Sequence, residues 1–253
     1  MKNRIFDGLL LAGLFVFEAC AQPMLAPTPG VSRSFAGVRV LEIRQAQGET
    51  RIERSNDNTV SVAYGYSYPE SCYRLGATQT GDVLDIHDVF EPVACSGRSD
   101  RIISVPDGVT ISFIGLQADL TMVGIEAGIV AYGREVAIRD LTLSGETELH
   151  SIDGDVFVSL DQAANHGLTI SSSHGRATLS IARSDLRGRF EFNAMNPNQI
   201  RSPYPFDEEG RYDCECEPGA ASWRWRKVFT SGGIELPRFT IMTRDGTAEL
   251  ELR

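Results

Sequence analysis

The sharpest chemical pattern in this 253-residue chain is a strand-like run that alternates tryptophan with basic residues, Trp223-Arg224-Trp225-Arg226-Lys227. Aromatic faces stack on sugars and cations, and guanidinium groups bind carboxylates. We therefore take Trp223, Trp225, Arg224 and Arg226 as the candidate ligand-binding residues. The alternative is an ordinary amphipathic strand, with both tryptophans facing the interior and the basic side chains in solvent.

Four carboxylates, Glu146, Glu148, Asp153 and Asp155, are clustered around one expected turn. Two carboxylates that face each other across a groove can act as acid and base on a glycoside. They could also bind calcium, although the chain lacks a dense Asp-rich repeat of oxygen ligands. The plainer interpretation is a solvated turn with outward-facing strand positions.

A second polar group, Asp85-Ile86-His87, places a carboxylate and an imidazole on one face of a strand. A metal or acid–base role is conceivable there, but a surface polar pair is the simpler explanation. The chain has no G-x-S-x-G elbow, H-E-x-x-H helix or phosphate-binding glycine loop. We therefore assign no catalytic residue, no metal site and no cofactor, and expect a protein that is not an enzyme.

Two interleaved glycine series indicate the scaffold that carries these residues. Within each series the glycines recur every 21 or 22 residues: Gly124, Gly145, Gly167 and Gly188, then Gly133, Gly154 and Gly175. Short alternating apolar runs follow most of them, and a fixed period with two short strands is typical of a β-solenoid. We predict an all-β, single-domain β-solenoid with coils of roughly 21 residues, whose glycines turn the corners with positive φ. Strands before the repeat are expected to cap its N-terminal end.

The repeat is interrupted at residues 196–222, which are rich in proline and contain Cys214 and Cys216. This segment predicts a long loop insertion, and loops of such length are usually functional or mobile. Strands are expected to return at residues 223–225, 234–236, 239–241 and 248–252.

The first residues predict export. A short positive region and a ten-residue apolar core (GLLLAGLFVF) precede Ala19-Cys20-Ala21, so residues 1–21 are expected to be a signal peptide. The alternative is a bacterial lipoprotein in which Cys20 carries the lipid anchor. Residues 22–34 are expected to be a proline-rich linker, and residues 35–253 the domain. The predicted location is the periplasm, the cell surface or the extracellular space.

The cysteines are consistent with an oxidising compartment. Apart from Cys20 there are four, Cys72, Cys95, Cys214 and Cys216, and an even count favours two disulfides. Three pairings are open, and we favour Cys72–Cys95 with Cys214–Cys216 because each pair is local, the second closing the long loop. A metal site at Cys214 and Cys216 competes with this prediction, but no histidine lies at ligand spacing beside them.

Composition excludes one class of partner. The formal net charge of −10 argues against nucleic acid, because phosphate binding requires clustered lysine and arginine. Membrane contact is expected only through a lipid anchor at Cys20.

Several segments resemble the bacterial adhesin-like β-solenoid domains of unknown function. They are the opening strand at residues 35–43, the Ile103-x-Val105-Pro-x-Gly108 turn, the step at residues 151–156, and the ending at residues 233–250. The resemblance covers residues 35–253 and implies an exported repetitive β-fold near the cell surface. It offers no catalytic residues, and the loop at 196–222 is more elaborate than that family leads us to expect.

The function predicted from these observations is an exported, adhesin-like interaction protein of the cell surface or envelope, whose partner is a surface glycan or an envelope protein. The alternative is a carbohydrate-active enzyme that cleaves polysaccharides on a β-helix, since parallel coils can display acids along a groove.

Overall fold

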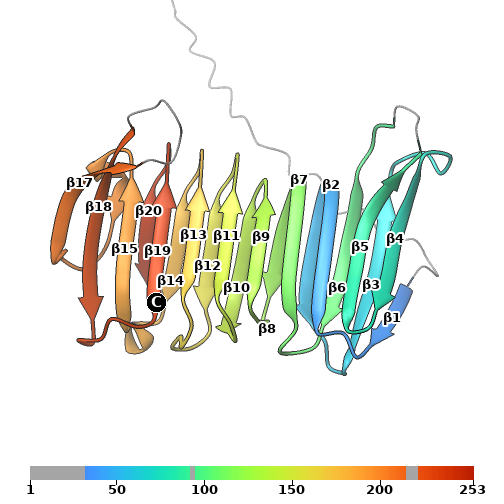
Figure 1. Cartoon of the computed structure of the whole chain (residues 1–253), viewed down its shortest axis with the longest axis horizontal. Helices are drawn as coiled ribbons and strands as arrows, with labels where there is room; N and C mark the ends of the chain where they lie inside the picture. Colours follow the sequence, from blue (N-terminus) through green and yellow to red (C-terminus); the bar gives the residue numbers. More distant parts are fainter. Residues whose placement is uncertain (1–31, 92–94, 215–221) are drawn as a thin grey trace, which may run out of the picture.

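The computed structural model describes residues 32–91, 95–214 and 222–253, and this part of the chain is all-β. Within these ranges the only helical segments are two short 3-10 turns, η1 (Arg183–Asp185) and η2 (Pro197–Gln199). None of the described helices is long and apolar enough to cross a membrane. The strands form one open sheet folded into two layers, because the long strands β2 (Val40–Arg54) and β7 (Thr110–Val123) run through both layers (Figure 1).

The first layer has hairpins at its two ends and parallel strands between them. Its order of neighbours is β4-β5-β2-β7-β9-β11-β13-β19-β15-β18-β17. Besides β2 and β7, the strands of this layer are β4 (Tyr73–Thr80), β5 (Val83–Phe90), β9 (Ile129–Gly133), β11 (Thr147–Ser151), β13 (Leu168–Ser172), β19 (Arg238–Thr243), β15 (Gly188–Ala194), β18 (Ser222–Ser231) and β17 (Glu208–Cys214).

The second layer runs behind the first in the order β1-β3-β6-β2-β7-β10-β12-β14-β20-β16. Its remaining strands are β1 (Ser32–Ala36), β3 (Thr59–Tyr66), β6 (Ser99–Val105), β10 (Val136–Leu143), β12 (Val156–Leu160), β14 (Ala177–Ile181), β20 (Ala248–Leu252) and β16 (Ile200–Arg201). The short β8 (Glu126–Ala127) pairs with the end of β10. The succession of strands along the long axis of the molecule is called the stack below.

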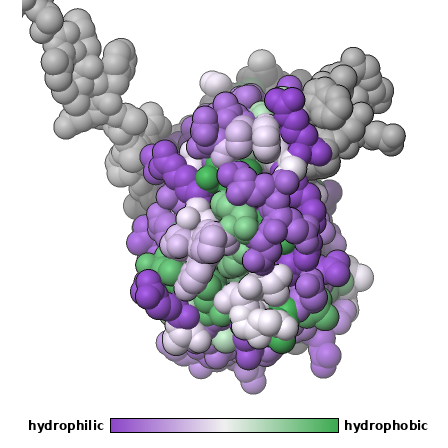
Figure 2. Space-filling model, turned by 90° about the vertical axis from the view of Figure 1, so that its left-hand side faces the viewer, coloured by the Kyte–Doolittle hydropathy of each residue, from purple (hydrophilic) through white to green (hydrophobic). Residues whose placement is uncertain are grey.

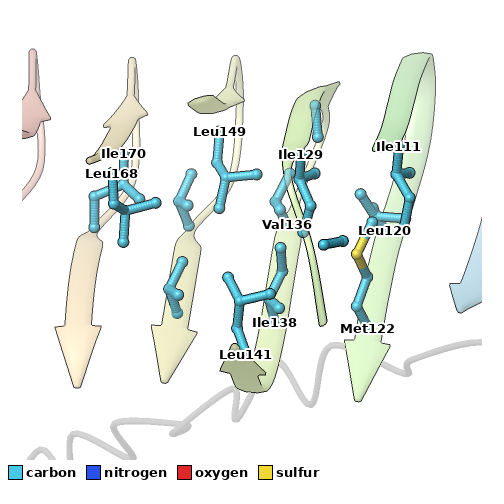
Figure 3. Close-up of a cluster of buried hydrophobic side chains, with 14 of the residues drawn as sticks. Ile111, Leu120, Met122, Ile129, Val136, Ile138, Leu141, Leu149, Leu168 and Ile170 are labelled. Carbon is cyan, nitrogen blue, oxygen red and sulfur yellow. The ribbon is translucent and has the colours of Figure 1, made fainter. Parts of the chain in front are cut away.

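The core lies between the two layers, because each strand points alternate side chains inward. In the second layer Val136, Val156 and Ala177 are register partners, so successive parallel strands are offset by 20 and 21 residues. Figure 3 shows Leu149, Leu168 and Ile170 of the first layer and Val136, Ile138 and Leu141 of the second among these packed side chains. Nearly all are fully buried, and each such Leu or Ile contributes about 1.5–3 kcal/mol.

The glycines of one series allow close backbone contact at a corner of the stack, and this corrects the reason we predicted for them. Gly154 and Gly175 do not have positive φ. A Cβ on Gly154 would lie 2.7 Å from the carbonyl oxygen of Arg134, and one on Gly175 would lie 2.4 Å from that of Gly154. In the other series Gly124 and Gly188 have positive φ, as predicted, whereas Gly145 and Gly167 do not.

At the corners of Gly175 and Gly246, a Ser or Thr hydroxyl three residues before the glycine stabilises the turn. The Ser172 hydroxyl accepts a hydrogen bond from the Gly175 N–H and lies 2.8 Å from the Gly154 carbonyl. Thr243 and Gly246 repeat this arrangement one step further along the stack. The corner is therefore a repeated [Ser/Thr]-x-x-Gly unit. In each unit the hydroxyl links the N–H of its own glycine to the carbonyl of the glycine in the neighbouring unit.

The last strands of the chain are inserted into the stack. β19 lies between β13 and β15, and β20 lies between β14 and β16, so residues 188–201 are further out than the C-terminal residues. Figure 1 accordingly places the C-terminus inside the stack. At the other end β2 is inserted in the same way, between β5 or β6 and β7. The sheet thus holds β2, β19 and β20 between strands that are distant from them in sequence.

The ends of the stack are closed by antiparallel hairpins rather than by a loop. The segment 196–222, predicted to be a long loop, contains β16, β17 and the start of β18. Three of its four prolines, Pro197, Pro203 and Pro205, lie before β17, and residues 208–214 pair antiparallel with β18. Residues 234–236, predicted to be a strand, are irregular instead, and two glycines with positive φ precede them.

At the N-terminal side, β1 begins at Ser32, within the segment expected to be a linker. The Cys72–Cys95 disulfide is present, as predicted. Residues 1–21, Cys20 and Cys216 lie outside the described residues, so the signal peptide, the lipid anchor and the Cys214–Cys216 pairing remain predictions.

Candidate functional site

The candidate binding strand β18 has two chemically different faces. Trp225 and Phe229 pack toward the hydrophobic core, and Lys227 lies with its ammonium 5.0 Å from the Phe206 ring on the same side. The opposite face carries Arg224 and Arg226. This division follows from the period of two along a strand.

The inward face of β18 contributes aromatic rings that close the end of the stack formed by β15, β18 and β17. Phe229 stacks on Phe190 with ring centroids 4.8 Å apart, and Tyr204 and Phe206 pack beside it. The Arg211 guanidinium lies 5.3 Å from the Trp225 ring. Figure 2 shows this end of the molecule, where hydrophobic surface is surrounded by hydrophilic side chains. Trp225 therefore has a packing role, and of Trp223 only the backbone position in β18 is described.

The outward face contributes to a polar cavity of about 300 Å³, the arginine pocket, which is built from three neighbouring strands and one connection. Its lining residues are Arg189 and Glu191 of β15, Arg226 of β18, Arg238, Phe239 and Thr240 of β19, and Glu235 of the β18–β19 connection. Only Arg226 of these seven was predicted.

Ion pairs organise one side of the arginine pocket. Arg226 contacts Glu191 at 2.9 Å and Glu208 at 3.2 Å. Arg189 lies 3.2 Å from Glu235 and 3.6 Å from Glu208. Glu208 and Glu235 are more than half exposed, whereas the side chain of Arg189 is only 19% exposed. The arginines are thus held by the scaffold, and two of their carboxylate partners lie at the solvent rim.

The charges in the arginine pocket shift the pKa values of both partners of the inner pair. Burial alone would raise the pKa of Glu191, but hydrogen bonds from Arg226 and Asn193 and the charges of Arg226 and Arg189 outweigh it, so this pKa is lowered. The hydrogen bond to Glu191 is also the largest cause that raises the pKa of Arg226. Both groups are therefore held in their charged forms.

The predicted acidic cluster is divided among separate partners. The Gly167 N–H donates to Glu146, and the Arg176 N–H donates to Asp155 at 2.8 Å. Glu148 lies 4.0 Å from His150 on the outward face of β11, and Asp153 lies 3.6 Å from His174. These contacts distribute the four carboxylates over β11 and the two corners that flank it, so they do not form a facing pair.

Asp155 instead belongs to an acidic column that the sequence did not reveal. The column runs along the corner of the stack that contains Gly154 and consists of Asp100, Glu49, Asp119, Glu135 and Asp155. Burial, and then the charges of Asp119 and Asp155, raise the pKa of Glu135, although Arg134 opposes them. Its members come from five separate strands or turns, which is why no local pattern indicated it.

The Asp85–His87 pair is a half-buried polar group, and the side chain of its neighbour Asp88 is only 4% exposed. Arg44 contacts Asp85 at 2.7 Å, and His87 Nδ1 lies 3.1 Å from the same carboxylate. Asp88 forms an ion pair with Arg101, which is fully buried, and accepts a hydrogen bond from the Tyr73 hydroxyl at 2.8 Å. In the described part of the chain, no group of three or more His, Cys, Asp or Glu residues could hold a metal ion.

The similarity of this chain to known proteins is limited. No protein-family model and no curated protein matches the chain. Among solved structures, a "putative cell adhesion protein" from Clostridium sporogenes is 10% identical with a TM-score of 0.39, and the match covers 90% of this chain and 99% of that chain. A "putative adhesin" from Bacteroides fragilis is 12% identical with a TM-score of 0.34 and the same coverage.

A third solved structure, a "putative adhesin" from Parabacteroides merdae, is 11% identical with a TM-score of 0.27 and covers 59% of this chain and 70% of that chain. The chain is thus similar to bacterial proteins with adhesin names.

Proposed function

We propose that the chain is an exported, adhesin-like interaction module of the bacterial cell envelope that binds its partner through the arginine pocket. The observation that carries the proposal is the convergence of Arg189, Arg226 and Arg238 from three strands on one cavity. Convergent polar groups in a concave site are the usual mark of a binding site.

Recognition fits the arginine pocket better than catalysis does. A general acid needs a raised pKa so that it stays protonated at neutral pH. The pKa of Glu191 is lowered, and this carboxylate is held by Arg226. Charged, immobilised groups of this kind suit the binding of a polar ligand.

The proposal includes the scaffold and the location. The parallel strands, offset by 20 and 21 residues, would be coils of a β-solenoid that displays the arginine pocket at one end. Residues 1–21 would direct export, with Cys20 as the lipid-bearing residue if the protein is a lipoprotein. A surface glycan or an envelope protein would be the partner.

The second candidate, a polysaccharide-cleaving enzyme, is favoured by one observation. Glu135 has a raised pKa and lies beside Asp119 and Asp155 in the acidic column, which is the pairing of unlike carboxylates that glycosidases use. Release of reducing ends from a polysaccharide, lost on Glu135→Gln but retained on Glu251→Gln, would establish this alternative and contradict the proposal.

The proposal can be tested with a paired substitution in the arginine pocket. Replacing Glu191 and Arg226 together by glutamine removes both charges of the inner pair and leaves neither one buried alone. We expect the purified variant to keep its melting temperature within a few degrees and to bind envelope fractions and arrayed glycans at least about tenfold more weakly. Arg176→Gln, on an exposed corner outside the arginine pocket, is the control. Unchanged binding by the paired variant, or no binding by the wild type, would contradict the proposal.

A further inference from the structure

Two arginines in the arginine pocket occupy directly paired positions on neighbouring strands. Arg189 of β15 and Arg238 of β19 are register partners in a parallel ladder. Like charges at such positions repel and destabilise the pairing. Arg189 is neutralised by Glu208 and Glu235, but none of the described residues forms an ion pair with the exposed Arg238. Of these two neighbouring guanidinium groups, that of Arg189 is therefore neutralised and that of Arg238 is not.

From this arrangement, and resting on the binding role proposed above, we infer that the arginine pocket binds the carboxylate of an acidic sugar residue between Arg189 and Arg238. A planar carboxylate matches the fork of a guanidinium and forms two parallel hydrogen bonds with it. The ligand charge would neutralise Arg238 and remove the repulsion from Arg189.

The chain already places a carboxylate at one of these arginines. Glu235 lies 3.2 Å from Arg189, belongs to the irregular connection between β18 and β19, and is 62% exposed in its side chain. An exposed side chain on such a connection exchanges easily with solvent, because an exposed ion pair is worth only about 0–1 kcal/mol. Glu235 thus contacts one of the two arginines that the ligand carboxylate would bind, and would compete with it there.

The remaining lining groups suit a sugar ring better than a peptide. Glu191 and Thr240 can accept hydrogen bonds from hydroxyl groups, whereas the ring of Phe239 is 2% exposed and offers no apolar subsite for a side chain. The volume of about 300 Å³ lies at the lower end of the range for ligand pockets, which is roughly 300–1,000 Å³. One sugar ring fits this space better than an extended chain.

Calorimetric titration of the purified protein with trigalacturonate tests the inference, with the methyl ester of the same trisaccharide as the uncharged control. We expect trigalacturonate to bind and the ester to bind at least about tenfold more weakly. Arg238→Gln should weaken binding by a similar factor, and Glu235→Gln should strengthen it several-fold because it removes the competing carboxylate. Arg176→Gln should leave the affinity unchanged.

Several results would overturn the inference. They are equal binding of acid and ester, unchanged affinity of Arg238→Gln, weaker binding by Glu235→Gln, or tighter binding of an acetylated tripeptide with a free C-terminal carboxylate. No binding of trigalacturonate would also overturn it. If the wild type nevertheless retains envelope material, and the paired Glu191 and Arg226 variant retains it at least about tenfold more weakly, the proposed function stands and only the ligand class is wrong.

Discussion

Phe190 and Phe239 lie stacked in the core, with ring centroids 4.6 Å apart and ring planes 12° from parallel. They belong to β15 and β19, which pair in parallel although the whole β16–β18 segment separates them in sequence. This contact exists because β19 returns into the stack between β13 and β15. The same insertion brings Arg238 beside Arg189 and so completes the arginine pocket.

Truncating Phe239 should destabilise the protein as strongly as a central core substitution. Its side chain is buried at 2% exposure, and Phe→Ala in a core costs about 3–5 kcal/mol. Leu236→Ala, only three residues away but 67% exposed, should change the free energy of unfolding by less than about 0.5 kcal/mol. Urea denaturation of the two variants measures the difference. Similar small losses for both would mean that β19 is a peripheral strand.

Gly246→Ala should destabilise the corner through collision rather than through an unfavourable φ. The added Cβ would lie 1.8 Å from the carbonyl oxygen of Gly175, so the backbone must shift, at a cost of about 1–3 kcal/mol or more. Gly210→Ala is the matched control, because a Cβ there meets nothing within 4 Å. A drop in melting temperature for Gly246→Ala alone is expected. Equal melting temperatures would rule out the close contact at this corner.

Glu135→Gln should raise the melting temperature at neutral pH. The raised pKa of Glu135 in the folded state means that its ionisation destabilises the fold, so stability is lost as pH rises from the ordinary pKa through the folded one. The variant should therefore be more stable than the wild type at pH 7 and equal to it below about pH 4. Thermal melts across this range check the sign. A variant that is less stable at pH 7 would contradict the repulsion in the acidic column.

Glu191→Gln should have the opposite sign. The lowered pKa of Glu191 means that its ionised form stabilises the fold above its ordinary pKa, and that this contribution is lost as pH falls through the folded pKa. The variant should melt at a lower temperature than the wild type at pH 7, and the difference should shrink toward about pH 3. A difference that does not change with pH would show that the ion pair with Arg226 is not its cause.

Replacing Cys72 and Cys95 together by serine should lower the free energy of unfolding by about 3 kcal/mol, the loop entropy expected for a disulfide across this length of chain. The two residues are 23 positions apart and join the turn before β4 to the segment before β6. Chemical denaturation of the oxidised wild type and of the double variant gives the difference. No difference would mean that residues 72–95 are equally restrained without the bond.

The spacing of the glycines and apolar runs was sufficient to predict an all-β chain. The offset between Val136, Val156 and Ala177 follows the same period. The order of strands along the stack was not predictable. The period of the sequence is the same whether β19 packs outside β15 or between β13 and β15. The role of Gly154 was also misjudged, since sequence does not distinguish a residue that needs positive φ from one that needs space.

The residues of the arginine pocket were only partly predictable for the same reason. Arg226 was found because it lies in a local aromatic and basic run, whereas Arg189, Glu191 and Arg238 come from strands that the fold brings together. One signal was available in retrospect, because Arg189-Phe190 and Arg238-Phe239 begin two runs of the same alternation. Such similarity suggests neighbouring positions in a repeat, and it could have indicated a pair of arginines.

Hydrogen–deuterium exchange of β19 tests most directly the claim that this strand is inserted between β13 and β15 and assembles the arginine pocket. Interior strands exchange through large-scale opening, whereas edge and terminal strands exchange by fraying. The structure predicts that the amides of residues 239–243 are protected as strongly as those of β13 and more strongly than those of the edge strand β17. Rapid exchange of residues 239–243 with slow exchange of β13 and β15 would contradict the insertion, and with it the arginine pocket.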